Sequence, residues 1–243
     1  MAPGFKQGRG PAMRKPIDID VVEARLRDLG QTSVSETVSL FKGGTFALAA
    51  VLLLEIVSAQ QGWTLRLTLW GVSFLITMTS YNAHLNTSIV DFRETVAGVV
   101  IIIVQMMAEL MLFVVLTPRF ELQMWHLWSF VYAGFMFVTA LRLRLFRPND
   151  GLTIDPALEP LFAAVQEGRR LGTRRTFINA VFAFGVGMAI LLLPKDSPWP
   201  VWLMLALGLI AAGQAIFGLF FMHRQRALME RMIDEALTAT AAD

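Results

Sequence analysis

The segment Thr95–Pro118, TVAGVVIIIVQMMAELMLFVVLTP, decides how this chain folds. As a helix it extends about 36 Å at about 1.5 Å per residue, which is long enough to cross a bilayer hydrocarbon core of about 30 Å. Gln105 and Glu109 lie near its middle and share one helical face because they are four residues apart. A charged residue at the centre of a membrane helix costs about 2.5–3.5 kcal/mol, so this face is expected to meet protein or water instead of lipid.

The rest of the chain contains similar apolar blocks. Hydrophobic residues make up 55% of the chain and charged residues 16%, a composition typical of a polytopic membrane protein. We therefore predict an all-α fold with six transmembrane helices and short amphipathic helices in the cytoplasm. The predicted spans are Phe41–Ala59, Thr68–His84, Thr95–Thr117, Trp125–Leu141, Phe177–Leu193 and Val201–Met222.

Basic residues predict the orientation, because Lys and Arg close to membrane spans remain on the cytoplasmic side. With the N-terminus inside, all of the 21 Lys and Arg except Arg66, Arg119 and Lys195 fall on that side. An even number of spans then makes both termini cytoplasmic. All 6 tryptophans fall at the predicted outer ends, where interfacial aromatic residues are common. We predict a multi-pass protein of the cell inner (plasma) membrane.

The order of spans and polar segments divides the chain into five parts. A cytoplasmic N-terminal tail carries an amphipathic helix, in which Asp20 and Glu23 have capping-box spacing. A four-helix transmembrane unit, a cytoplasmic linker, a two-helix transmembrane unit and a cytoplasmic C-terminal helix follow. The linker contains a helix start at Asp155-Pro156 or Glu159-Pro160. The predicted boundaries are 1–33, 34–142, 143–176, 177–223 and 224–243.

A polar stripe runs along the second predicted span. Its members are separated by four, three and four residues and therefore share one face. A short loop makes the second and third spans an antiparallel hairpin, which brings the stripe near Glu109. The stripe then either forms interhelical hydrogen bonds or lines a hydrated path, and Glu109 is either a protonated structural carboxyl or an ion or proton site. The candidate ion-path residues are Glu109, Gln105, Ser73, Thr77, Ser80 and His84.

Basic side chains near the inner ends of the spans are expected to contact lipid. Lys42 lies close to the start of the first span, where a lysine can extend its side chain to the headgroups. The basic inner surface attracts anionic headgroups of the inner leaflet. Nucleic acid is not an expected partner, because the arginines lie beside spans without interleaved aromatic residues. The predicted headgroup residues are Lys42, Arg169, Arg170, Arg174 and Arg175.

Small residues line one face of the last predicted span. Such a face permits close contact between helices in a membrane. We expect it to form a helix-packing surface made by Gly208, Ala211, Ala212, Ala215 and Gly218.

Catalytic signatures are missing from the sequence, which has no HExxH, GxSxG, Walker-type or dinucleotide-binding GxGxxG motif. We therefore predict neither an enzyme nor a cofactor or metal. His84, His126 and His223 could ligate a haem, but histidines at helix ends more often face headgroups. The absence of cysteine excludes disulfides and thiol chemistry.

One further pattern involves the first two spans. The run Phe41-Lys42-Gly43-Gly44-Thr45-Phe46-Ala47, the pair Glu55-Ile56, and Asn82 and His84 resemble the bacterial six-helix relatives of the endosomal and lysosomal potassium channel family. In that family a first helix containing Phe-Ser-Asp lines a tetrameric pore. The resemblance implies a cation channel, although Lys42-Gly43 replaces the Ser-Asp pair here.

Two hypotheses for the function follow from these patterns. The first is an oligomeric cation channel or ion-translocating protein with a polar path along the second and third spans. The second is a non-catalytic subunit, scaffold or sensor of a larger membrane assembly. The expected partners are accordingly copies of this chain or other membrane subunits.

The orientation can be tested with single cysteines, because the chain has none of its own. In intact cells, a cysteine replacing Ser197 should react with a membrane-impermeant maleimide, and one replacing Asn149 should react only after lysis. The reverse labelling pattern would contradict the predicted orientation.

Overall fold

The computed structural model describes residues 24, 33–59, 62–90, 96–120, 125–145, 156, 159–194 and 197–240. Apart from short turns these residues are helical, and none of them forms a β-strand, so the all-α prediction is confirmed for this part of the chain. The helices are α2 (Ser33–Ala59), α3 (Trp63–Val90), α4 (Val96–Val114), α5 (His126–Leu145), α6 (Glu159–Leu192) and α7 (Trp199–Thr240).

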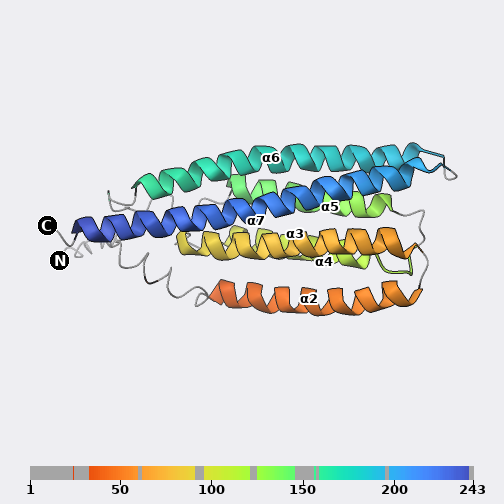
Figure 1. The fold of residues 1–243 in the computed structure, drawn as a ribbon, viewed down its shortest axis with the longest axis horizontal. Coiled ribbons are helices and arrows are strands. Elements are labelled where there is room, and N and C mark those ends of the chain that lie inside the picture. Colours follow the sequence, from red (N-terminus) through yellow and green to blue (C-terminus); the bar gives the residue numbers. More distant parts are fainter. Residues whose placement is uncertain are drawn as a thin grey trace, which may run out of the picture.

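The helices form one elongated bundle in which successive helices run in opposite directions (Figure 1). α6 packs mainly along α5, and α7 packs mainly along α3. α6 and α7 contact each other much less, although they are consecutive in the chain. The predicted separation of a four-helix unit from a two-helix unit therefore does not correspond to the way the helices pack.

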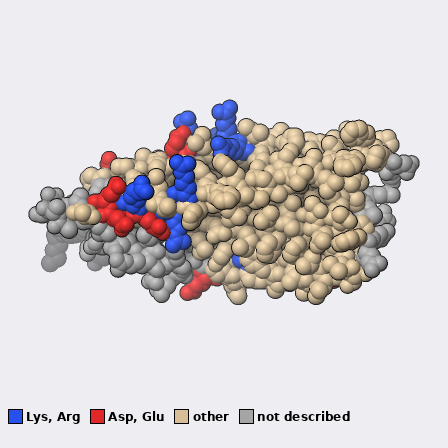
Figure 2. Space-filling view, in the orientation of Figure 1, with Lys and Arg blue, Asp and Glu red and all other residues tan. Residues whose placement is uncertain are grey.

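Charged side chains gather at one end of the bundle, where α7 ends (Figure 2). We call this the charged end; α2 begins there and α6 also starts there (Figure 1). The remainder of the visible face carries almost no charge. A bundle with this distribution can hold its uncharged part within a bilayer and its charged end in or beyond the headgroups.

Five of the helices are long and apolar enough to cross a membrane. These five helices are compatible with an integral membrane protein, the class of protein predicted from the sequence. The qualifying segments are Val38–Ala59, Ala97–Val114, His126–Leu145, Glu159–Leu192 and Trp199–Glu235.

The second predicted span, Thr68–His84, lies in α3, which is helical but does not belong to these five. Its lower hydropathy comes from Arg66 and from the polar stripe. Arg66 and Ser73 are buried inside the bundle and hydrogen-bonded there, which lowers the cost of placing their polar groups in an apolar environment. α3 also continues to Val90, beyond the predicted end of this span at His84.

Two helices are much longer than a bilayer requires. α6 has 34 residues and α7 has 42, so they extend about 51 Å and about 63 Å at about 1.5 Å per residue. Glu159-Pro160 begins α6 as predicted, with the proline at a position where its missing N–H costs nothing. Residues 159–176, which were assigned to the predicted linker, form the first half of α6 and continue into the next predicted span without interruption.

The structure describes most of the predicted C-terminal cytoplasmic helix but little of the predicted N-terminal segment. Residues 1–33 are described only at positions 24 and 33, so the predicted tail and amphipathic helix lie outside the described residues. The helical prediction for 224–243 is confirmed as far as Thr240, because α7 continues past His223 without a break. Met229 and Ile233 on this extension are buried, as expected for one apolar side.

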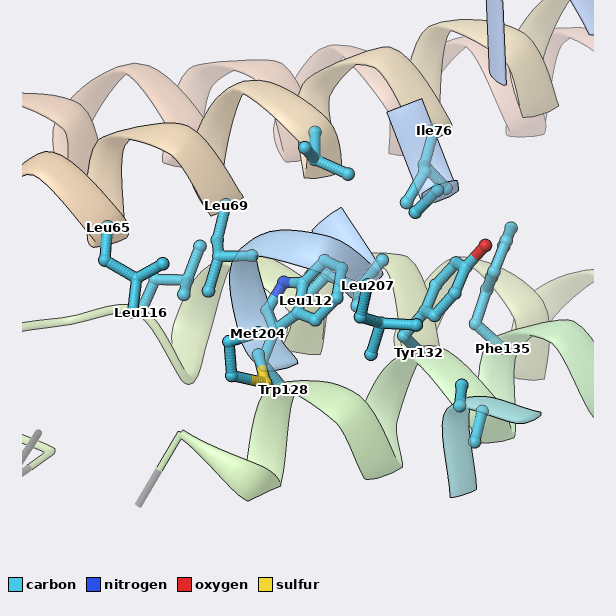
Figure 3. Close-up of a cluster of buried hydrophobic side chains, with 14 of the residues drawn as sticks. Leu65, Leu69, Ile76, Leu112, Leu116, Trp128, Tyr132, Phe135, Met204 and Leu207 are labelled. Atoms are coloured by element: carbon cyan, nitrogen blue, oxygen red, sulfur yellow. The ribbon is translucent and has the colours of Figure 1, made fainter. Parts of the chain in front are cut away.

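The main core lies where α3, α4, α5 and α7 meet (Figure 3). Trp128 and Tyr132 stack with ring centroids 5.3 Å apart, and both side chains are almost completely buried. Leu69, Leu112 and Met204 pack in the same cluster. In a membrane such contacts stabilise the bundle through close packing, since lipid is as apolar as the core.

The small residues of α7 lie against α3. A Cβ atom added to Gly208 would approach Leu69 to 3.2 Å, and one added to Gly218 would approach Thr79 to 3.0 Å. The Thr79 hydroxyl donates a hydrogen bond to the Ala215 carbonyl at 3.2 Å, which the short distance between the helices allows. The predicted packing face thus lies between two helices of the same chain.

Ala215→Leu should destabilise the bundle, because a buried alanine at this interface leaves no room for three more carbons. We expect a loss of about 1–3 kcal/mol in the free energy of unfolding. Ala206→Leu is the matched control, since Ala206 lies on the exposed side of the same helix. Thermal unfolding in mild detergent measures both. Equal midpoints for Ala215→Leu and wild type would show that this packing surface does not limit stability.

Candidate functional site

A buried ion pair connects α2 with α4. The Lys42 ammonium donates to Oε2 of Glu109, and the two side chains are 4% and 1% exposed. The prediction that Lys42 contacts lipid headgroups was therefore wrong. The Glu109 carboxylate on the neighbouring helix supplies the counter-charge for Lys42. Burying the two charges as a pair costs far less free energy than burying either one alone.

Ser80 of α3 links this ion pair to the rest of the bundle. Its hydroxyl donates to Oε1 of Glu109 at 2.5 Å and accepts from Lys42 Nζ at 3.3 Å. It also accepts a hydrogen bond from Gln105 Nε2 at 3.0 Å. Ser80 thus touches both charges and the glutamine, so three helices are held together through one hydroxyl group.

Arg142 of α5 extends the network toward the charged end. Its Nη1 donates to Gln105 Oε1 at 3.3 Å, and its Nη2 lies 3.2 Å from His84 Nδ1. Because a guanidinium has only donors, Nδ1 of His84 acts as the acceptor, and this imidazole carries its proton on Nε2. We call the connected set the charged network; its members are Lys42, Ser80, His84, Gln105, Glu109 and Arg142.

Four of the six predicted ion-path residues belong to the charged network, and two do not. Ser73 donates to the Leu69 carbonyl at 2.8 Å and accepts from Trp128 Nε1 at 3.1 Å, so it joins α3 to α5 within the core. Thr77 is fully buried, and its hydroxyl has no hydrogen-bond partner among the described residues. Both therefore lie on the stripe but outside the charged network.

The sequence reasoning missed the roles of two basic residues. Lys42 was visible as a charge inside an apolar block, and the need of Glu109 for a counter-charge was a signal that could have paired them. Arg142 gave a weaker signal, because a basic residue in the last turn of a helix is common at membrane boundaries and favourable for the helix dipole. Neither pairing follows from periodicity within one helix.

The four predicted headgroup arginines of α6 lie near the charged end, in different surroundings. Arg170 is largely exposed and lies 3.7 Å from Glu167, a contact that contributes little in water. Arg174 is also exposed. The Arg175 guanidinium lies over the Phe217 ring of α7, 5.6 Å from its centroid. Arg169 and Arg175 line a cavity, and Arg170 and Arg174 do not.

This cavity, of about 720 Å³, lies between α3, α5, α6 and α7. Ser80, Gln105 and Arg142 form part of its wall, so the charged network reaches the cavity surface. Asn179 and Gln214 form another part and exchange two amide hydrogen bonds, of 2.8 and 2.9 Å. α6 packs along α5 and α7 packs along α3, while α6 and α7 contact each other much less. The cavity occupies the space that this packing leaves between the two helix pairs.

Arg66 occupies the opposite half of the bundle and has a structural role. It is buried and donates to the carbonyls of Leu116 and Thr117 through Nη1, and of Phe120 through Nη2. These carbonyls follow the end of α4, where a cation satisfies free acceptors and compensates the negative end of the helix dipole. This contact explains a buried charge without assigning it to a functional site.

Comparison of the sequence and structure with protein-family models, curated proteins and solved structures finds no match. The resemblance to the potassium channel family therefore remains a prediction from the sequence. What the fold and site define is a class: an all-α protein with five apolar helices compatible with a membrane and a charged network buried among α2, α3, α4 and α5.

Breaking the ion pair from one side should destabilise the protein. Lys42→Met leaves Glu109 buried without its cation, and a loss of about 3–5 kcal/mol is expected for such a change. The double variant Lys42→Met/Glu109→Gln removes both charges and should recover most of that loss. Thermal unfolding in mild detergent compares them, with Glu55→Gln as a control near the other end of α2. A single variant as stable as wild type would contradict a stabilising ion pair.

Proposed function

We propose that the protein is an ion-translocating integral membrane protein and that the ion it moves is the proton. The observation that carries the proposal is the Lys42–Glu109 pair, which is buried but connected through Ser80 to the wall of a large cavity. In this proposal the protein lies in the plasma membrane with its charged end toward the cytoplasm. The cavity then forms the inner part of the path.

The chemistry of the network favours a proton over a metal cation. The Lys42 ammonium already occupies one oxygen of Glu109, and the Arg142 guanidinium lies three hydrogen bonds away, through Ser80 and Gln105. A metal cation approaching the carboxylate would have to displace Lys42 against the repulsion of both charges. A proton needs no such space, because it can move along hydrogen bonds that are already in place.

The first step of the proposed path transfers one proton from Lys42 to Glu109. When the Lys42 N–H bond breaks and the Glu109 O–H bond forms, a charged pair becomes a neutral pair. In a low-dielectric interior these two states lie much closer in energy than they do in water. Ser80 provides the connection to the cavity: the protonated Glu109 gives its proton to the Ser80 oxygen as the Ser80 O–H bond releases its own proton toward the cavity, and the neutral Lys42 amine then binds the next proton.

The second candidate function is a non-catalytic subunit, scaffold or sensor of a membrane assembly. One observation favours it: Lys42 and Glu109 neutralise each other, so the pair is complete without a transported ion. Under this alternative the network serves only to hold α2, α3, α4 and α5 together. The double variant of the ion pair distinguishes the two functions, since it removes titration while it keeps the bundle free of buried unpaired charge.

Proton flux should be measured in proteoliposomes that contain a pH-sensitive dye and a potassium-valinomycin gradient. Lys42→Met/Glu109→Gln should lower the flux at least tenfold, because neither position can then release or bind a proton. Glu55→Gln should leave it unchanged. The assembly state of each variant is checked by size-exclusion chromatography before reconstitution. Equal flux in the double variant and wild type, or no flux in wild type, would overturn the proposal and favour the subunit function.

A further inference from the structure

The cavity between α3, α5, α6 and α7 is itself amphipathic along the bundle. At the end nearer the centre of the bundle it is lined by Ile76, Phe135 and Ile210. At the end nearer the charged end it is lined by three arginines, Arg142, Arg169 and Arg175, and by no acidic residue. A ligand that fits this arrangement has an apolar part directed toward the membrane centre and an anionic part at the arginines.

The rim of the cavity indicates where such a ligand enters. Several rim residues on α6 and α7 are large, apolar and exposed, including Leu171, Ile178, Phe217 and Phe221. In a membrane-embedded bundle this surface faces lipid. The opening is therefore directed sideways into the bilayer, which favours an occupant that resides in the membrane over a solute from the aqueous phase.

The inner polar groups do not prevent an acyl chain from binding. Asn179 and Gln214 satisfy each other through two hydrogen bonds, and the Tyr132 hydroxyl donates to Gln214 at 3.1 Å. Groups that are already paired do not require a polar ligand. The volume of about 720 Å³ lies within the range of about 300–1,000 Å³ that is usual for small-molecule sites.

We infer that this cavity binds the acyl chain of one anionic phospholipid from the membrane, with the phosphate at Arg169 and Arg175. The Arg175 guanidinium is held at the rim by its contact with Phe217, so its position is defined before the lipid enters. Arg142 connects the same cavity to the charged network. The inference does not depend on proton movement, because it rests on the shape and charge of the cavity alone.

Lipid binding can be measured on the full-length protein in mild detergent by native mass spectrometry. Phosphatidylglycerol should bind at least tenfold more tightly than phosphatidylcholine. Arg169→Gln/Arg175→Gln should weaken phosphatidylglycerol binding at least tenfold, whereas Arg170→Gln should not, because that arginine lies on the same helix outside the cavity. Equal binding of the two lipids, or an unchanged affinity in the double arginine variant, would overturn the inference.

A second pair of variants tests the cavity apart from its charge. Gly213→Phe places a large side chain in the cavity, since Gly213 lines it and a Cβ there meets no atom within 4 Å. Gly185→Phe is the control, because Gly185 is equally unobstructed but lies on α6 and does not line the cavity. Only Gly213→Phe should lose phosphatidylglycerol. Retained binding in Gly213→Phe would overturn the inference, and so would equally strong binding of water-soluble glycerol phosphate, which has no acyl chain.

Discussion

The buried ion pair between Lys42 and Glu109 constrains the arrangement of the helices around it. Neither charge can face lipid, and neither can be buried alone without a large cost in free energy. α2 and α4 must therefore present these side chains to each other, and α3 must supply the hydroxyl of Ser80 that both charges contact. An apolar interface would leave the rotation of each helix about its axis less defined, because lipid and protein offer similar apolar surroundings.

Local features of the chain were largely predictable from the sequence. Apolar blocks of about the length needed to cross a bilayer locate the helices, since every backbone group in lipid must be hydrogen-bonded within its own helix. The spacing of Gln105 and Glu109, and their proximity to Ser80 across a short turn, follows from helical periodicity and chain connectivity. The start of α6 was narrowed to two positions, Asp155-Pro156 or Glu159-Pro160, because a proline is tolerated in the first turn, and the helix begins at the second.

Features that depend on contacts between distant helices were not predictable. Lys42 was expected at the headgroups because a lysine near a helix end usually reaches them. It is buried instead because α4 lies beside α2 and offers Glu109 as its ion-pair partner. Ser73 and Thr77 share a face with Ser80 but lie at other levels along α3, where the neighbouring side chains differ. Ser73, for example, contacts Trp128. The division of α6 and α7 between different partners has no signature in either helix alone.

The length of α7 gives the bundle a mechanical property. α7 contacts α3 near Gly208, and from there the helix continues without a break to Thr240, a distance of about 48 Å at about 1.5 Å per residue. Its contacts do not end at Gly208, because Gly218 lies against Thr79 and both Met229 and Ile233 are buried farther along the helix. α7 therefore connects the core of the bundle to the charged end as one continuous helix that is packed over most of its length. A displacement of α7 in the core would have to be accommodated by the contacts at the charged end.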